Sequence, residues 1–212
     1  MNKVYKVFPG GKFKVLTFSY DDGKIEDRRL VKLFNKFNLK ATFNLNTGII
    51  DPAIRIPQEE WPELYKGHDI AVHTFTHPTM IRLNDYNALR EILDDKDNLE
   101  KIFKRPIYGL AYPNGSYDNR IVDIAKSVGI KYARVTNDKY AATKAAEAYA
   151  ANADGPMLIG DENGFSMPED YMCWVPTCHH NHNLIDFGKK FMALTLSLIH
   201  ISEPTRRVVI SY

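Results

Sequence analysis

The chain has 212 residues, of which 44% are hydrophobic and 25% are charged. Both fractions are close to globular averages, so an intrinsically disordered chain is excluded and a buried core is expected. The 28 Lys and Arg residues nearly balance the 26 Asp and Glu residues, which leaves a net charge of +2. This balance gives no electrostatic reason to expect nucleic acid or an anionic membrane as a partner. The 2 cysteines are too few for a disulfide scaffold.

The apolar segments bear on location. The apolar run at 191–201 is interrupted by Thr195 and Ser197, and it is shorter than the roughly 20 residues that a membrane-spanning helix needs. Residues 1–6 lack the apolar region of a signal peptide. We therefore predict no transmembrane segment and favour the cytoplasm, while cell-wall association and secretion stay open.

Strand-like and helix-like segments alternate along the first two thirds of the chain. In chain order we expect a strand at 14–20, a helix at 27–38, a strand at 41–45, a helix at 58–66, a strand at 69–73, a helix at 84–104, a strand at 108–112, a helix at 118–128 and a strand at 130–135. After Thr136 the pattern weakens: the alanine-rich segment 141–153 is interpreted as an exposed helix or an insertion, and 183–195 as a helix.

This alternation predicts βαβ units and a parallel sheet, and therefore the α/β class. We find no internal repeat and no linker rich in Pro, Gly or Ser that would divide the chain. A full (β/α)8 barrel takes about 250 residues, which is more than this chain has. A barrel and an open sheet both stay open on this pattern alone.

Polar residues gather where three of the expected strands end. The first strand runs into Asp21 and Asp22, the third into His73 and His77, and the fourth into the segment 112–115. Parallel α/β folds collect functional groups at the carboxyl ends of their strands. One Asp and two His are a ligand set for Zn²⁺ or another divalent metal that leaves a position for water, as catalytic sites do. With two adjacent Asp residues, one can bind the metal while the other faces the water.

The three segments resemble motifs of the polysaccharide deacetylases with a NodB-type domain, which form carbohydrate esterase family 4. Residues 19–23 (SYDDG) are similar to the family's T-F-D-D-G, residues 73–77 (HTFTH) fit its H-[ST]-x-x-H, and residues 110–115 (LAYPNG) are similar to F-A-Y-P-Y-G. The resemblance implies an α/β fold of the NodB type: a distorted (β/α)7 barrel that is open at one side.

The resemblance also implies roles for individual residues. It makes Asp22, His73 and His77 the ligands of a divalent metal, Zn²⁺ in the first place, and Asp21 the catalytic base. It further assigns bracing of the histidine-bearing loop to Thr74, shaping of the sugar groove to Tyr112 and Pro113, and binding of the oxyanion to the backbone N–H of Asn114.

Two departures from the family pattern add candidates. Many members carry an arginine near the third motif that pairs with the base, whereas position 110 is Leu here. Arg134 is the candidate to supply that charge, and the alternative is a solvated or purely structural ion-pair residue. In the cysteine- and histidine-rich segment 173–182, we expect a loop over the mouth of the site, in which His179 or His180 touches substrate, rather than a second metal site.

The end of the chain carries a further expectation. Residues 197–206 (SLIHISEPTR) look like translated sequencing-adapter read-through. We therefore predict a deacetylase domain at 1–196 and a non-native tail at 197–212. The barrel would then lack its C-terminal strand, together with the general-acid histidine that the family carries there.

The functional hypothesis is a metal-dependent hydrolase that removes acetyl groups from an N-acetylated or O-acetylated carbohydrate through metal-activated water. Its enzyme class is that of hydrolases acting on carbon–nitrogen bonds other than peptide bonds. Two alternatives stay open: a NodB-fold hydrolase of a non-carbohydrate C–N bond, and a carbohydrate-binding protein that keeps the metal site without turnover.

Overall fold

The computed structural model describes residues 14–136, 170–174, 176, 178–179, 183–193 and 206–211. Its strands are β1 (Lys14–Asp21), β2 (Ala41–Leu45), β3 (Asp69–Val72), β4 (Gly109–Ala111), β5 (Tyr132–Arg134), β6 (Cys178–His179) and β7 (Arg206–Ser211). Its helices are α1 (Asp27–Lys36), α2 (Trp61–Leu64), α3 (Asp85–Phe103), α4 (Asn119–Ser127) and α6 (Leu184–Ala193). Short 3-10 turns occur at η1 (Gln58–Glu60), η2 (Met80–Arg82), η3 (Pro113–Gly115) and η4 (Tyr171–Cys173).

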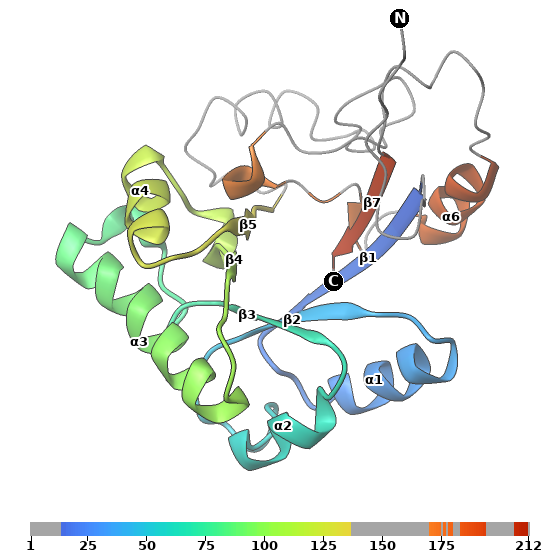
Figure 1. Cartoon of the computed structure of the whole chain (residues 1–212), viewed down its shortest axis with the longest axis horizontal. Coiled ribbons are helices and arrows are strands. Elements are labelled where there is room, and N and C mark those ends of the chain that lie inside the picture. Colours follow the sequence, from blue (N-terminus) through green and yellow to red (C-terminus); the bar gives the residue numbers. More distant parts are fainter. Residues whose placement is uncertain are drawn as a thin grey trace, which may run out of the picture.

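The strands form one parallel sheet in the order β5-β4-β3-β2-β1-β7-β6. Figure 1 shows that the sheet curls and that α1, α2, α3 and α4 lie along its outer side. Strands β1 to β5 thus make a curled half-barrel in which each crossover passes over the outer face, as right-handed βαβ units require. The predicted distorted α/β barrel is confirmed.

The open side of the half-barrel lies between β5 and β6, which are the two edge strands of the sheet. Trp174 forms a parallel bridge with Arg134 at the end of β5, and Cys178, four residues further on, pairs with Ile210 of β7. Strand β7 pairs with β1 from Lys14↔Arg206 to Ser19↔Ser211. A segment of the predicted tail therefore lies where a strand that closes the barrel would lie, and its non-native origin stays a prediction.

Local sequence signals set the helix boundaries. The side chain of Asn84 accepts a hydrogen bond from the N–H of Asn87 at the start of α3, and Asp118 caps α4 in the same way through the N–H of Ile121. The expected helix at 58–66 is split into η1 and α2, with Pro62 in the first turn of α2, where proline is tolerated. The segment 141–153 lies outside the described residues.

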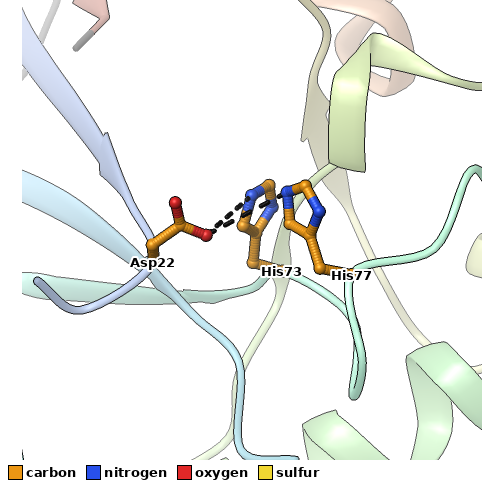
Figure 2. Close-up of side chains that lie close together, drawn as sticks. All are labelled: Asp22, His73 and His77. Atoms are coloured by element: carbon orange, nitrogen blue, oxygen red, sulfur yellow. Dashed lines mark ion pairs between the residues drawn. The ribbon is translucent and has the colours of Figure 1, made fainter. Parts of the chain in front are cut away.

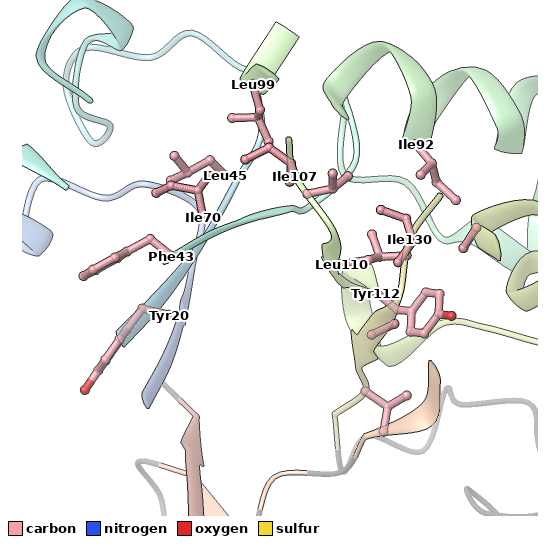
Figure 3. Packing of buried hydrophobic residues seen from close by; sticks show 14 of the residues in the cluster. Tyr20, Phe43, Leu45, Ile70, Ile92, Leu99, Ile107, Leu110, Tyr112 and Ile130 are labelled. Atoms are coloured by element: carbon pink, nitrogen blue, oxygen red, sulfur yellow. The ribbon is translucent and has the colours of Figure 1, made fainter. Parts of the chain in front are cut away.

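The core lies between the outer face of the curled sheet and the helices. Its central side chains are 1% exposed or less and include Phe43, Leu45, Ile70, Leu110 and Ile92 (Figure 3). This packing fixes the carboxyl ends of β1 to β5 relative to one another. None of the helices in the described ranges has the length and apolar composition needed to cross a bilayer.

Candidate active site

The carboxyl ends of the strands bring the predicted polar residues together. Asp21 ends β1 and Asp22 follows it, while His73 directly follows β3. Arg134 ends β5. Because the strands are parallel, these residues share one edge of the sheet although they are far apart in sequence.

Asp22, His73 and His77 form a cluster of candidate metal ligands. Their ligand atoms all lie within 4.8 Å of one another. Oδ1 of Asp22 is 3.9 Å from Nε2 of His73 and 4.0 Å from Nε2 of His77, and Figure 2 shows both rings turned toward the carboxylate. One carboxylate and two imidazoles suit Zn²⁺ and leave positions for water and substrate.

A second contact fixes the chemical form of His73. Its Nδ1 lies 2.8 Å from the backbone oxygen of Ala111. A carbonyl oxygen only accepts hydrogen bonds, so Nδ1 carries the proton and Nε2 presents its lone pair to the cluster. Burial lowers the pKa of His73, although the nearby carboxylate of Asp21 opposes this effect. The ring is therefore neutral near pH 7, as a metal ligand must be.

Two of the three candidate ligands, and Thr74 beside the third, lie on strained backbone. Asp22 has a φ of 79°, Thr74 of 65° and His77 of 57°. Left-handed conformations are uncommon for residues other than glycine and are least favourable for a β-branched residue such as Thr74. Such strain persists at functional sites only where surrounding contacts hold it.

Arg55 supplies one set of these contacts. Its Nη1 donates to the backbone oxygen of Asp22 and, at 3.0 Å, to Oδ1 of Asn46, while its Nη2 lies 3.4 Å from Oδ1 of Asp22. The amide nitrogen of Asn46 in turn donates to the backbone oxygens of His73 and Thr74. One guanidinium thus links the backbone of Asp22 to the loop that carries both histidines.

Asp21 lies beside the cluster and is held by cationic and neutral donors. Nη2 of Arg134 lies 2.6 Å from each carboxylate oxygen, and the amide nitrogen of Asn44 lies 2.7 Å from Oδ1. Burial by itself would raise the pKa of Asp21, but Arg134, His73 and Asn44 outweigh it and hold the pKa below its ordinary value. Asp21 is therefore an ionised carboxylate at neutral pH, 3.9 Å from Nε2 of His73.

The third predicted segment, 112–115, is largely buried. Tyr112 is completely buried and stacks on Tyr117 at 5.1 Å between ring centroids, and Pro113 is buried as well. Neither ring is exposed enough to stack on a sugar, and their predicted role in shaping the substrate groove stays a prediction. The aromatic residue after β4 belongs to the core because Tyr117 closes over it. Asn114 is exposed in a left-handed conformation with a φ of 56°.

Other predicted residues have different outcomes. The hydroxyl of Thr74 is buried and makes no hydrogen bond within the part of the chain that the structure describes, so the bracing of the loop comes from other residues. The backbone of His179 lies in β6, whereas its side chain and all of His180 lie outside the described residues. Substrate contact by these two histidines stays a prediction.

The sequence interpretation missed several residues that support the cluster, namely Asn44, Asn46, Arg55, Glu91 and Asp95. The two asparagines could have been found from the sequence, because a polar side chain within or just after an apolar strand is unusual. Arg55 in a loop and the two acids on an amphipathic helix carried none, since such residues usually face solvent.

The sequence profile of the polysaccharide deacetylase family matches residues 9–133. This chain belongs to the polysaccharide deacetylase family. The match ends before Arg134 but includes both aspartates and both histidines of the site. A search of curated proteins gave no match.

Solved structures agree with this assignment. A Streptococcus pyogenes deacetylase, PplD, solved with acetate, is 27% identical, with a TM-score of 0.57 over 61% of this chain and 58% of that chain. A polysaccharide deacetylase from Bacillus cereus is 23% identical, with a TM-score of 0.51 over 56% of this chain and 39% of that chain.

A CE4 family pseudoenzyme from Bacillus anthracis is 15% identical, with a TM-score of 0.53 over 98% of this chain and 57% of that chain. At this identity, and at that of the Bacillus cereus protein, the likeness concerns the fold alone. This chain spans less than two thirds of the length of each of these proteins, namely 58%, 39% and 57% in the order given.

Proposed function

We propose that this deacetylase-family protein hydrolyses acetyl groups from an N-acetylated or O-acetylated carbohydrate with the help of a divalent metal, Zn²⁺ in the first place. The observation that carries the proposal is the convergence of Asp22, His73 and His77 next to an ionised Asp21. Metal-assisted hydrolysis needs two components from a protein: the metal ligands, and an ionised carboxylate that is not itself a ligand.

Each of the ligands has a defined task. The carboxylate of Asp22 and the Nε2 atoms of His73 and His77 would hold the ion, with His73 oriented by the carbonyl of Ala111. When bound, a divalent metal polarises the acetyl carbonyl and lowers the pKa of water to about 7. The protein contributes the fixed donor set and the orientation of the rings.

Asp21 is suited to take the proton from the attacking water. It is ionised and lies beside the cluster, but it is not one of the three clustered ligands. Arg134 donates to both of its oxygens and Asn44 donates to Oδ1, so the carboxylate cannot rotate freely. A positioned base of this kind contributes roughly 10²–10⁴-fold to a rate.

The backbone N–H of Asn114 is the candidate donor to the oxyanion that forms when water attacks the acetyl carbon. Asn114 is exposed just beyond β4, the strand whose Ala111 contacts His73. Its N–H makes no hydrogen bond to any residue in the described ranges. Loss of one such donor typically costs about 10²–10³ in rate.

The test combines metal analysis of the purified protein with acetate release from acetylated oligosaccharides. The proposal expects bound metal, acetate release and loss of release with a chelator. The Asp94→Asn variant should match the wild type in both measurements, because Asp94 pairs with Arg90 on α3 and not with the cluster. Binding of oligosaccharides without acetate release would favour the carbohydrate-binding alternative. Turnover of a cyclic imide or ureide without acetate release would favour the non-carbohydrate hydrolase.

A further inference from the structure

Helix α3 carries two carboxylates, Glu91 and Asp95, one turn apart and both bonded to residues 73–77, which we call the histidine loop. We propose that Glu91 and Asp95 are positioning residues that clamp the histidine loop and thereby set the spacing of His73 and His77 for metal binding. This inference rests on the proposed function, because it concerns the same metal cluster.

Glu91 holds the middle of the histidine loop with three hydrogen bonds. Its backbone oxygen accepts from the N–H of Phe75 at 2.9 Å. Its carboxylate accepts from the N–H of Thr76 at 2.7 Å and from the hydroxyl of Thr76 at 2.6 Å. Phe75 and Thr76, which separate the left-handed residues Thr74 and His77, are therefore both hydrogen-bonded to Glu91.

Asp95 holds the start of the loop from the protein interior. Its Oδ2 accepts from the N–H of His73 at 3.1 Å, a donor that is shared with the backbone oxygen of Leu45. Its Oδ1 accepts from both the N–H and the hydroxyl of Thr47 at 2.7 Å. The residue is completely buried, so its oxygens are satisfied by these neutral donors instead of by water.

The two carboxylates complete a set of contacts that leaves the loop little freedom. The N–H of Gly48 donates to the backbone oxygen of Phe75, and a Cβ at position 48 would collide with that oxygen. Together with Asn46, which binds the oxygens of His73 and Thr74, these bonds reach every loop residue before His77. Strained backbone at Thr74 and His77 requires such over-determination.

The clamp acts on metal affinity because it fixes both rings before the metal arrives. The ring centroids of His73 and His77 are 4.7 Å apart. If the loop relaxed at Thr74 or His77, the rings would separate and metal binding would have to restore their spacing. Outer-sphere partners of metal ligands typically change metal affinity by about 10–100-fold.

The test compares Glu91→Gln and Thr76→Val with Asp94→Asn on the same helix. Zinc affinity is measured by competition with a chromophoric chelator, the absorption spectrum of the cobalt-loaded protein reports ligand geometry, and thermal unfolding is followed without metal. We expect Glu91→Gln and Thr76→Val to lose at least about tenfold in affinity and to change the cobalt spectrum. Asp94→Asn and Thr76→Ser, which keeps the hydroxyl, should stay within about twofold of wild type.

The outcomes separate the clamp from the proposed function. A wild-type protein that binds neither metal overturns the metal assignment and the clamp together. A wild-type protein that binds zinc, with unchanged affinity and cobalt spectrum in Glu91→Gln, overturns only the clamp. A lower unfolding temperature of Glu91→Gln with unchanged zinc affinity also overturns only the clamp, because Glu91 would then have a structural role alone. A folded Asp95→Asn variant should likewise lose at least about tenfold in zinc affinity, and an unchanged affinity in it would remove Asp95 from the clamp.

Discussion

Arg134 and Asp21 are separated by 113 positions in sequence, yet Nη2 of Arg134 lies 2.6 Å from both carboxylate oxygens of Asp21. Arg134 is only 5% exposed, so it is not a solvated residue, while a purely structural ion pair stays an alternative to a role in catalysis. It reaches Asp21 from the end of β5, whereas the resemblance places the arginine near position 110, where this chain has leucine. The charge is thus supplied from a neighbouring strand end.

This ion pair predicts a pH effect. Arg134 helps hold the pKa of Asp21 below its ordinary value, so Arg134→Met should raise that pKa and move the acidic limb of the kcat profile to higher pH. We also expect kcat to fall by about 10²-fold, because the base loses its orientation. Arg105→Gln, which removes a surface pair with Asp69, is the control. An unshifted acidic limb in Arg134→Met would contradict the role of the pair.

The ligand and base assignments predict different losses. Asp22→Ala and His77→Ala should abolish metal binding and acetate release, because each removes one of the three clustered donors. Asp21→Asn should keep the metal, measured by elemental analysis, while acetate release falls by about 10²–10⁴-fold. Full activity in Asp21→Asn would rule out Asp21 as the base.

Asp27 predicts how stability depends on pH away from the metal cluster. Burial raises its pKa from an ordinary 3.8 to about 7, although a hydrogen bond from Tyr65 at 2.8 Å opposes this. Between about pH 4 and pH 7 the folded state keeps a proton that the unfolded chain releases. The free energy of unfolding therefore falls as the pH rises, by at most about 1.4 kcal/mol per pH unit for one proton.

Asp27→Asn should remove this contribution. Its urea unfolding free energy should decline less between about pH 5 and pH 8 than that of the wild type, and should equal or exceed it at the upper end. Asp123→Asn, an exposed position on α4, is the control and should keep the wild-type slope. The same slope in Asp27→Asn as in the wild type would show that Asp27 does not titrate in this range.

The predicted tail can be tested by ending the chain at Leu196. We expect this shorter protein to bind zinc as tightly as the full chain, because the three candidate ligands follow β1 and β3 and none lies beyond His77. Its unfolding temperature reports what the pairing of β7 with β1 contributes. A loss of zinc affinity on truncation would show that residues 197–212 support the site.

The sequence alone determined the order of the elements as far as β5 and the three residues of the candidate metal cluster. The alternation of strands and helices specified a parallel sheet, and the sheet edge gathered Asp22 with the two histidines. These features were predictable because hydrophobic periodicity is a local property. Two histidines four residues apart need only one loop to bring them together.

Only the tertiary structure decided what surrounds the cluster. The pairing of Arg134 with Asp21, the link through Arg55 and the bonds from Glu91 to Thr76 all depend on how far the sheet curls and on the orientation of α3. The same packing buried Tyr112 against Tyr117, which the sequence did not indicate. The sequence does not show whether such a side chain is exposed or buried, because burial is set by the elements that pack over it and not by its neighbours along the chain.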